Sequence, residues 1–436
     1  MSISVSVCVL LAFLAWVLPI DSQIGVGGLS LHINPELDLL GRYLILEDTS
    51  RPILIFLFGM AAFWFLGAYF TYNHRYFWPL GLMIVSLLVG VLAVQPFYYS
   101  ALFVEVVVLL SIPVLYPPGT RIAQGGSRIL IYQSLALPVF LFAGWFVAGI
   151  DANPGNESLI NAAVVFLGLG IAFWLAVFPF YTWIPLLLEE THVYCSSFII
   201  NMLSAVSLLT VLNFVNSFEW LRDYALLPQV LRLVSILMVF SAGIWSIFEK
   251  KISRLFGYSI ILETGNSLVA LSLLNADGYH LYLALLLPRM IAVGVWTICM
   301  AELFEKNIVL VEDLSGLFHR KPLLVMNFLV AYLALGGFPL LAIFPLRYMI
   351  YEILAQQSFV TVVWLFAGHI LFLITGFRII YRVFLFSENE VKIEEKWPLM
   401  VLASLGAFSL FLLGFFPNWI IQWMAGLLQN FPKLVF

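Results

Sequence analysis

Five ionisable side chains lie inside stretches of the chain that are otherwise apolar. They are Glu105, Glu263, Arg289, Arg347 and His369. A charged side chain is costly inside a bilayer unless it is paired or hydrated, and such residues usually line an ion or proton path. Carboxylates and imidazoles can take up and release protons, whereas arginine stays protonated at accessible pH. The set therefore favours a polar axis along which protons or cations move.

The same residues also have a purely structural interpretation. Glu263 and Arg289 could form an ion pair that locks two neighbouring helices together. His369 could be a hydrogen-bonded histidine of the core. Glu189 and Glu190, which lie in a predicted connection, could be solvated loop carboxylates. These alternatives stay open from the sequence alone.

Two apolar segments carry residues that interrupt helices. The first contains Pro179 and Pro185, and the second contains Gly337 and Pro339. Proline inside a helix removes a backbone donor and clashes with the preceding turn. In a membrane, such a break is tolerated where it is buried in protein or lines a cavity. We therefore expect two broken helices.

The two breaks are spaced as a duplication would space them. Pro179 and Pro339 are 160 residues apart, and Glu105 and Glu263 are 158 residues apart. The second break lies five predicted spans after the first, and an odd offset reverses the orientation in the membrane. Interrupted helices in oppositely oriented halves are typical of inverted repeats in transporters. We expect two inverted five-helix repeats, each with a broken helix.

The composition indicates that these ionisable side chains and helix breaks belong to a membrane protein. Of the 436 residues, 63% are hydrophobic and 10% are charged, and the mean hydropathy is +1.04. These values lie well outside the range of soluble domains. About twenty apolar residues cross a bilayer as a helix, and this length predicts an all-α protein with about 13 spans. The predicted spans are 2–20, 52–72, 78–95, 98–117, 129–150, 159–180, 194–216, 227–248, 253–274, 280–303, 322–350, 360–385 and 398–428.

The basic residues indicate how the chain is oriented. Most lysines and arginines lie in connections that follow even-numbered spans, as Arg128 and Lys250 do. The positive-inside rule therefore predicts a cytoplasmic N-terminus and an outward C-terminus, in a membrane that we expect to be a prokaryotic cytoplasmic membrane. Residues 2–20 have no preceding lysine or arginine and no small-residue cleavage site, so we expect an anchored first span.

The predicted organisation is one membrane domain over residues 1–436. It divides into N-terminal helices (1–97), a partial first repeat (98–216), a second repeat (227–385) and a C-terminal helix (398–430).

Cofactor and nucleic-acid sites are not predicted. Cys8, Cys195 and Cys299 are far apart in or beside apolar runs, which fits neither a metal site nor a disulfide framework. Nothing in the sequence has the pattern of a flavin, iron–sulfur or haem site, so we expect no cofactor and no metal. The net charge of −4 is too near neutral to indicate a nucleic-acid partner.

Four segments resemble one known family. The segment at 178–185 reads "FPFYTWIP" and is followed by "EETHVYCSS". It resembles the Phe-Pro-Phe-His-x-Trp-Leu-Pro segment of the antiporter-like membrane subunits of respiratory complex I, membrane-bound hydrogenases and multisubunit cation/proton antiporters. The other three segments, over about residues 98–385 in the same order, are "ALFVEVVVLLS", "KKISRLFGYSIILETGNS" and "EDLSGLFHRKPLLVMNFLVAYLALGGFPLLAIFPLR".

The resemblance implies a role for several residues. In that family, two inverted five-helix repeats each form half of a proton path. Glutamate, lysines or histidine and a terminal lysine or glutamate exchange protons along a hydrated axis. Glu105 matches the family glutamate, Arg289 matches the lysine between the halves, and Arg347 matches the terminal lysine or glutamate.

The chain departs from the family pattern chiefly in its first half. Trp174 and Val206 occupy positions of two family lysines, and Tyr181 replaces a histidine. From the resemblance we also expect one N-terminal helix fewer than the usual fourteen. Glu105 then lacks its family partner and would tend to stay protonated in an apolar setting. We expect a degenerate first half-channel, while the fixed charges of Arg289 and Arg347 could hold Glu263 ionised.

The leading hypothesis is a non-catalytic membrane-arm subunit of a complex I-like redox-driven pump. It would contribute to translocation of protons or sodium ions, with other membrane subunits and the lipid bilayer as partners. One alternative is a structural subunit that conducts nothing. The other is a stand-alone secondary transporter, which a roomy pocket at the membrane midplane would favour.

Overall fold

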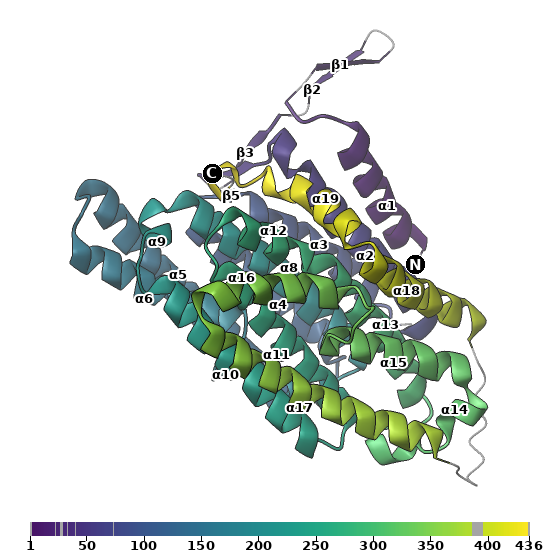
Figure 1. The fold of residues 1–436 in the computed structure, drawn as a ribbon. Coiled ribbons are helices and arrows are strands. Elements are labelled where there is room, and N and C mark those ends of the chain that lie inside the picture. Colours follow the sequence, from purple (N-terminus) through teal and green to yellow (C-terminus); the bar gives the residue numbers. More distant parts are fainter. Residues whose placement is uncertain are drawn as a thin grey trace.

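The computed structural model describes residues 2–21, 23–26, 29–32, 34–39, 41–72, 74–385 and 396–434. The chain forms an obliquely packed bundle of helices (Figure 1). Its first part contains α1 (Ser2–Val17), α2 (Arg51–Thr71), α3 (Phe77–Ala93), α4 (Ser100–Leu115), α5 (Gln124–Ala152), α6 (Glu157–Trp174), α7 (Trp183–Glu190), α8 (Val193–Ser217) and α9 (Glu219–Arg222).

The second part repeats the pattern of long helices joined by short connections. It contains α10 (Leu227–Phe248), α11 (Ile252–Leu271), α12 (Ala276–Ala284), α13 (Leu286–Phe304), α14 (Leu317–Arg320), α15 (Pro322–Gly336), α16 (Ile343–Gln357), α17 (Phe359–Phe384), α18 (Trp397–Phe415) and α19 (Pro417–Leu428). Among the described residues, nine helical segments are long and apolar enough to cross a membrane, and three further apolar helices are shorter. The chain is therefore an all-α membrane protein with multiple spans, as the hydropathy predicts.

Short strands add a feature that the sequence analysis did not predict. The connection 21–51 contains two antiparallel hairpins, of which the first projects beyond the helices in Figure 1. The strands are β1 (Gln23–Val26), β2 (Leu29–His32), β3 (Glu36–Leu39), β4 (Arg42–Ile45) and β5 (Val94–Gln95), with β4 between β3 and β5. Arg42 lies over the ring of Tyr99, 3.8 Å from its centroid. This cation–π contact holds the second hairpin against the start of α4.

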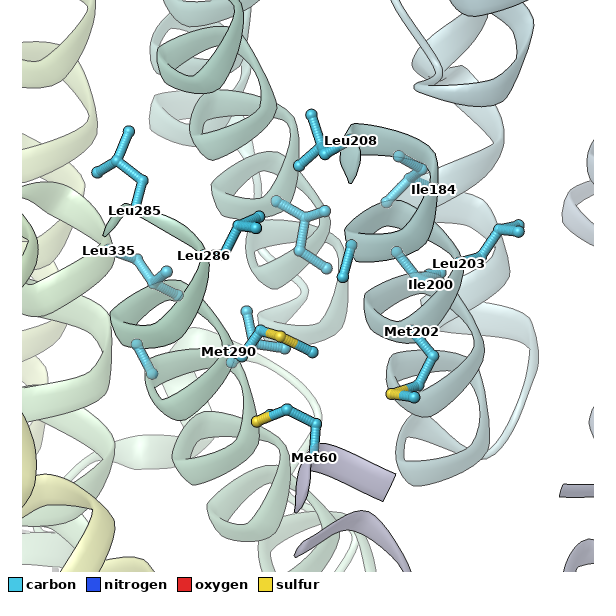
Figure 2. Close-up of a cluster of buried hydrophobic side chains, with 14 of the residues drawn as sticks. Met60, Ile184, Ile200, Met202, Leu203, Leu208, Leu285, Leu286, Met290 and Leu335 are labelled. Carbon is cyan, nitrogen blue, oxygen red and sulfur yellow. The ribbon is translucent and has the colours of Figure 1, made fainter. Parts of the chain in front are cut away.

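The core lies where α8 meets α13. Of the apolar segments, α8 and the α12–α13 segment are almost wholly buried, whereas most residues of α10, α6 and α18 are half-buried or exposed. Figure 2 shows Ile200 and Leu203 of α8 near Leu286 and Met290 of α13, with Met60 of α2 below them. The interior of the bundle is thus largely aliphatic, and any polar path must pass through side chains set into it.

Two helices are interrupted by backbone of the same form. The α6 helix ends before Ala176, whose φ is 50°, and α15 ends before Gly337, whose φ is 75°. In each, the next N–H bonds five residues back, from Val177 to Ala172 at 2.8 Å and from Phe338 to Leu333 at 2.9 Å. This is the Schellman ending of a helix.

The helix-breaking residues do not all lie in the gaps themselves. Pro179 lies in the gap between α6 and α7, and Pro339 lies in the gap between α15 and α16. Pro185 instead lies in the first turn of α7, where its missing N–H has no intrahelical partner to lose.

Candidate functional site

An ion pair between Glu263 and Arg347 forms the centre of the polar axis. Glu263 lies in the middle of α11 and Arg347 near the start of α16. Arg347 Nη2 is 2.5 Å from Glu263 Oε1, and the two residues are 5% and 1% exposed. The Asn266 amide donates to the same oxygen at 3.2 Å. Glu263 Oε2 has no hydrogen-bond partner within the described residues, so it is the oxygen open to a proton.

The second helix break holds Arg347 in place. Its guanidinium donates to the carbonyls of Leu335 and Gly336, at 3.1 Å each. These are the last carbonyls of α15, where the helix dipole favours a cation. A Cβ atom at Gly337 would overlap the guanidinium. Glycine is therefore needed at this position both for its positive φ and for the close approach of the arginine.

His369 joins the ion pair through Asn266. The Asn266 Nδ2 atom lies 3.2 Å from His369 Nε2, and His369 Nδ1 lies 2.7 Å from the carbonyl oxygen of Leu365. Because a carbonyl only accepts, Nδ1 carries the proton and Nε2 accepts from Asn266. The Tyr351 hydroxyl donates to Asn266 Oδ1 at 3.4 Å and lies 3.2 Å from His369 Nδ1. One amide thus bonds to both groups that can exchange a proton.

Arg289 lies beside this network and does not pair with Glu263. Its Nη2 atom donates to Ser204 Oγ at 2.9 Å and to Thr264 Oγ1 at 3.1 Å. The ion pair between Glu263 and Arg289 that the sequence left open is therefore wrong, because the start of α16 brings Arg347 to the carboxylate instead. Arg289 is thus a buried cation of α13 held by one hydroxyl group of α8 and one of α11.

The first half of the bundle has aromatic side chains where the second has charges. Trp174 is buried, and its ring lies 4.1 Å from that of Phe140, which stacks on Phe214 at 5.6 Å. Glu105 accepts a hydrogen bond from Ser134 Oγ at 2.8 Å. No hydrogen bond among the described residues joins Glu105 to the network of Glu263, so the structure does not bring these two carboxylates together.

Val206 and Tyr181 are the other two positions at which the chain departs from the family pattern. Val206 is fully buried in α8. The Tyr181 hydroxyl lies 3.1 Å from Ser241 Oγ on α10. Neither position supplies a cation to Glu105.

Gln133 is a residue that the sequence analysis missed. Its amide donates to the carbonyls of Phe173 and Trp174 at 3.3 Å each. These are the last carbonyls of α6, so Gln133 caps the first broken helix as Arg347 caps the second. A single glutamine in an apolar helix gives little signal in the sequence, and only the unpaired helix end explains it.

Glu189 and Glu190 are not solvated loop carboxylates. Glu189 forms ion pairs with Lys251 and Arg254. It lies outside the apolar spans, and although burial opposes ionisation, the hydrogen bonds from these two cations lower its pKa. Glu190 accepts a hydrogen bond from the N–H of Gly125 at 2.6 Å, at the start of α5. Both carboxylates therefore fasten α7 to neighbouring helices.

Metal ligands do not cluster in the part of the chain that the structure describes. No group of three or more histidine, cysteine, aspartate or glutamate side chains there could hold a metal ion. Cys8, Cys195 and Cys299 are each free and buried.

Comparison with known proteins gives a family match over more than half of the chain. Residues 136–375 match the family described as NADH:quinone oxidoreductase/Mrp antiporter, TM. The chain is 28% identical over 257 residues to NADH-quinone oxidoreductase subunit 14 of Thermus thermophilus, covering 57% of each protein. It is 24% identical over 414 residues to NADH-quinone oxidoreductase subunit N of Coxiella burnetii, covering 86% of this chain and 83% of that protein. The chain spans less than two thirds of the length of several such relatives.

Solved structures share the fold over nearly the whole chain. A chain of the membrane-bound sulfane sulfur reductase, an archaeal respiratory membrane complex, has a TM-score of 0.81 at 17% identity, covering 99% of this chain and 91% of that one. A chain of the Mrp complex from Dietzia sp. has a TM-score of 0.77 at 15% identity, covering 100% and 94%. A chain of respiratory complex I from Thermus thermophilus has a TM-score of 0.75 at 18% identity, covering 99% of both. The family predicted from the sequence is confirmed: this chain belongs to the NADH:quinone oxidoreductase/Mrp antiporter membrane family.

Proposed function

We propose that this chain is an antiporter-like subunit in the membrane arm of a redox-driven complex, where it contributes to translocation of protons or sodium ions. The observation that carries the proposal is the buried network of Glu263, Arg347, Asn266 and His369. Buried ionisable groups on a hydrogen-bonded line are the usual sign of an ion or proton path in a membrane protein.

Glu263 is the group that would change its protonation state. Arg347 remains positive, so it stabilises the ionised carboxylate and the pair breaks when Glu263 takes up a proton. The carbonyls at the end of α15 then keep the arginine in place. An amide does not itself carry a proton, so transfer between His369 and Glu263 requires water to replace the Asn266 bridge. Each proton that passes would in this way separate Glu263 from Arg347 once.

The first half would not conduct. Trp174 and Phe140 fill the place at which the family has a lysine, and Glu105 has Ser134 as its hydrogen-bond partner. We assign conduction to the second half, and assign Arg289 the role of a fixed charge between the halves. A purely structural subunit is the second candidate, because apolar side chains surround the contact between α8 and α13 (Figure 2).

The proposal includes two inverted repeats over residues 98–216 and 227–385. The matching helix endings at Ala176 and Gly337 support it, because they lie 161 residues apart, close to the spacing of the prolines and glutamates. It also includes thirteen crossings, namely the twelve apolar segments described above and α11, with α16 continuing α15. In this arrangement the N-terminus is cytoplasmic and the C-terminus faces outward.

The partners would be other membrane subunits, and the electron-transfer chemistry would take place in those partners. The relatives named above are subunits of NADH-quinone oxidoreductases, and the similar structures come from multisubunit membrane complexes. Isolation of the native complex through a tag on this chain, followed by mass spectrometry, tests the assignment. Co-purification of redox or other antiporter-type membrane subunits is expected. Recovery of this chain from its native membranes without any such subunit would contradict the proposal and favour a stand-alone transporter.

A further inference from the structure

Two adjoining pockets open beside the first helix break. Their volumes are about 400 and 470 Å³, and both are lined by Trp245, Arg254 and Tyr258. One extends along Pro179 and Tyr181 toward α5, and the other extends past the end of α10. Because they share a wall, the two pockets form one continuous recess, here called the basic recess.

The basic recess has an excess of positive charge. Four cations line it, and two carboxylates lie against them, which leaves two positive charges uncompensated. The cations are Arg128, Lys250, Lys251 and Arg254, and the carboxylates are Glu189 and Glu249. The charge of the recess therefore matches an anion.

Two of the cations are available to a ligand. Lys251 and Arg254 are engaged by Glu189. Arg128 donates to the Thr182 hydroxyl at 3.2 Å, and within the described residues it has no carboxylate partner. The exposed side chain of Lys250 has no ion-pair partner in that part of the chain either. Arg128 lines one pocket and Lys250 lines the other, whereas Arg254 lines both.

Large apolar side chains surround the same recess. Trp245 is 53% exposed, Phe248 is 71% exposed and Phe178 is 41% exposed. Phe248 is the last residue of α10, where a span meets the membrane surface. Tryptophan beside lysine and arginine at the end of a span is typical of the boundary between headgroups and acyl chains.

We propose that the basic recess binds an anionic phospholipid. Its phosphate would lie between Arg128 and Lys250, and its acyl chains would lie along Trp245 and Phe248. Basic pockets between helices at the membrane surface bind anionic headgroups in this way. A soluble anion would use only the cations, and a neutral lipid only the aromatic groups, so an anionic lipid is the ligand that fits both. The bound lipid would join α5 and α7 to α10 and α11, and this role does not depend on ion conduction.

Quenching of tryptophan fluorescence by brominated lipid tests the proposal. The full-length chain is reconstituted in phosphatidylcholine vesicles that contain about 5 mol % of brominated phosphatidylglycerol. A parallel sample contains the same amount of brominated phosphatidylcholine instead. The signal of Trp245 is the difference between the wild type and Trp245→Phe. The expected result is stronger quenching by brominated phosphatidylglycerol, corresponding to a roughly tenfold local enrichment of the anionic lipid.

Two variants and one competitor make the test specific. Arg128→Gln/Lys250→Gln should lose the preference for phosphatidylglycerol, whereas Arg121→Gln/Lys306→Gln, which removes the same charge on the same side of the membrane but outside the recess, should keep it. Inorganic phosphate at a roughly physiological, millimolar concentration should not displace the lipid, because phosphate gains no apolar contact in the recess. Equal quenching by the two lipids, an unchanged preference in Arg128→Gln/Lys250→Gln, or displacement by inorganic phosphate would overturn the proposal.

Discussion

Arg347 closes the second broken helix as Gln133 closes the first. The Arg347 guanidinium donates to the last two carbonyls of α15, and the Gln133 amide donates to the last two carbonyls of α6. One cap is a permanent cation and the other is neutral. The second cap also forms an ion pair with a carboxylate, Glu263, whereas no hydrogen bond among the described residues joins Gln133 to one. The two halves thus share a backbone plan but differ in whether the break carries a charge.

Removing the charge at Arg347 should destabilise the fold. Arg347→Gln leaves the buried Glu263 carboxylate without its ion-pair partner, and loss of one partner of a buried pair costs about 3 kcal/mol or more of unfolding free energy. Denaturant unfolding in detergent micelles measures the change. Glu263→Gln/Arg347→Gln should recover much of the loss, and the exposed Arg121→Gln should cost little. A double variant no more stable than Arg347→Gln would show that the pair is not the cause.

A methyl group at position 337 should disturb the same site. Gly337→Ala adds strain at φ 75° and a clash with Arg347, whereas Gly41→Ala adds strain at φ 73° in open space. We expect Gly41→Ala to lower the free energy of unfolding by about 1 kcal/mol, and Gly337→Ala to lower it clearly more. Parallel unfolding curves of the two variants measure the difference. Equal costs would contradict the role assigned to Gly337.

Trp174 should behave as a packing residue. Trp174→Ala leaves a cavity against Phe140, and such truncations cost about 3 kcal/mol or more. Trp145, which is 70% exposed, provides the matched control, and Trp145→Ala should change the unfolding free energy little. If the two variants were equally stable, the first half would not be closed by packing around Trp174.

The Glu189 cluster should make stability depend on pH. The cations Lys251 and Arg254 lower the pKa of Glu189 below its ordinary value of 4.5 despite its partial burial. The unfolded chain therefore binds this proton more readily, and the stabilisation is complete above pH 4.5 and lost as the pH falls through the lower, folded-state pKa. Glu189→Gln should thus lower the free energy of unfolding by about 1 kcal/mol at pH 7. The difference in this free energy between the variant and the wild type should disappear below pH 4.5. A difference that is constant with pH would contradict the ionic origin.

Hydropathy and helix breakers predicted much of the fold because these signals are local. A run of apolar residues is sufficient to indicate a helix in a bilayer, and proline or paired glycines indicate where it is interrupted. The strands of residues 23–45 were missed because hairpins of four-residue strands give little periodic signal.

The contacts within the site depended on distance in space and could not be predicted in the same way. Glu263 and Arg347 are 84 residues apart, and Arg289 is much nearer in sequence, yet the α15–α16 break directs Arg347 to the carboxylate. The roles of Asn266 and Gln133 were missed because an amide is recognised as a bridge or cap only when its partners are known.

In the proposed mechanism, protons or cations pass through the second half by way of Glu263 and not through the first half by way of Glu105. Ion uptake by proteoliposomes of the purified native complex, driven by its own electron donor, compares Glu263→Gln with Glu105→Gln. Glu263→Gln should lower uptake through this subunit by roughly a hundredfold, as loss of a positioned proton-transfer group does, while Glu105→Gln should leave uptake near the wild-type rate. Unchanged uptake in Glu263→Gln, or equal losses in both variants, would contradict this mechanism.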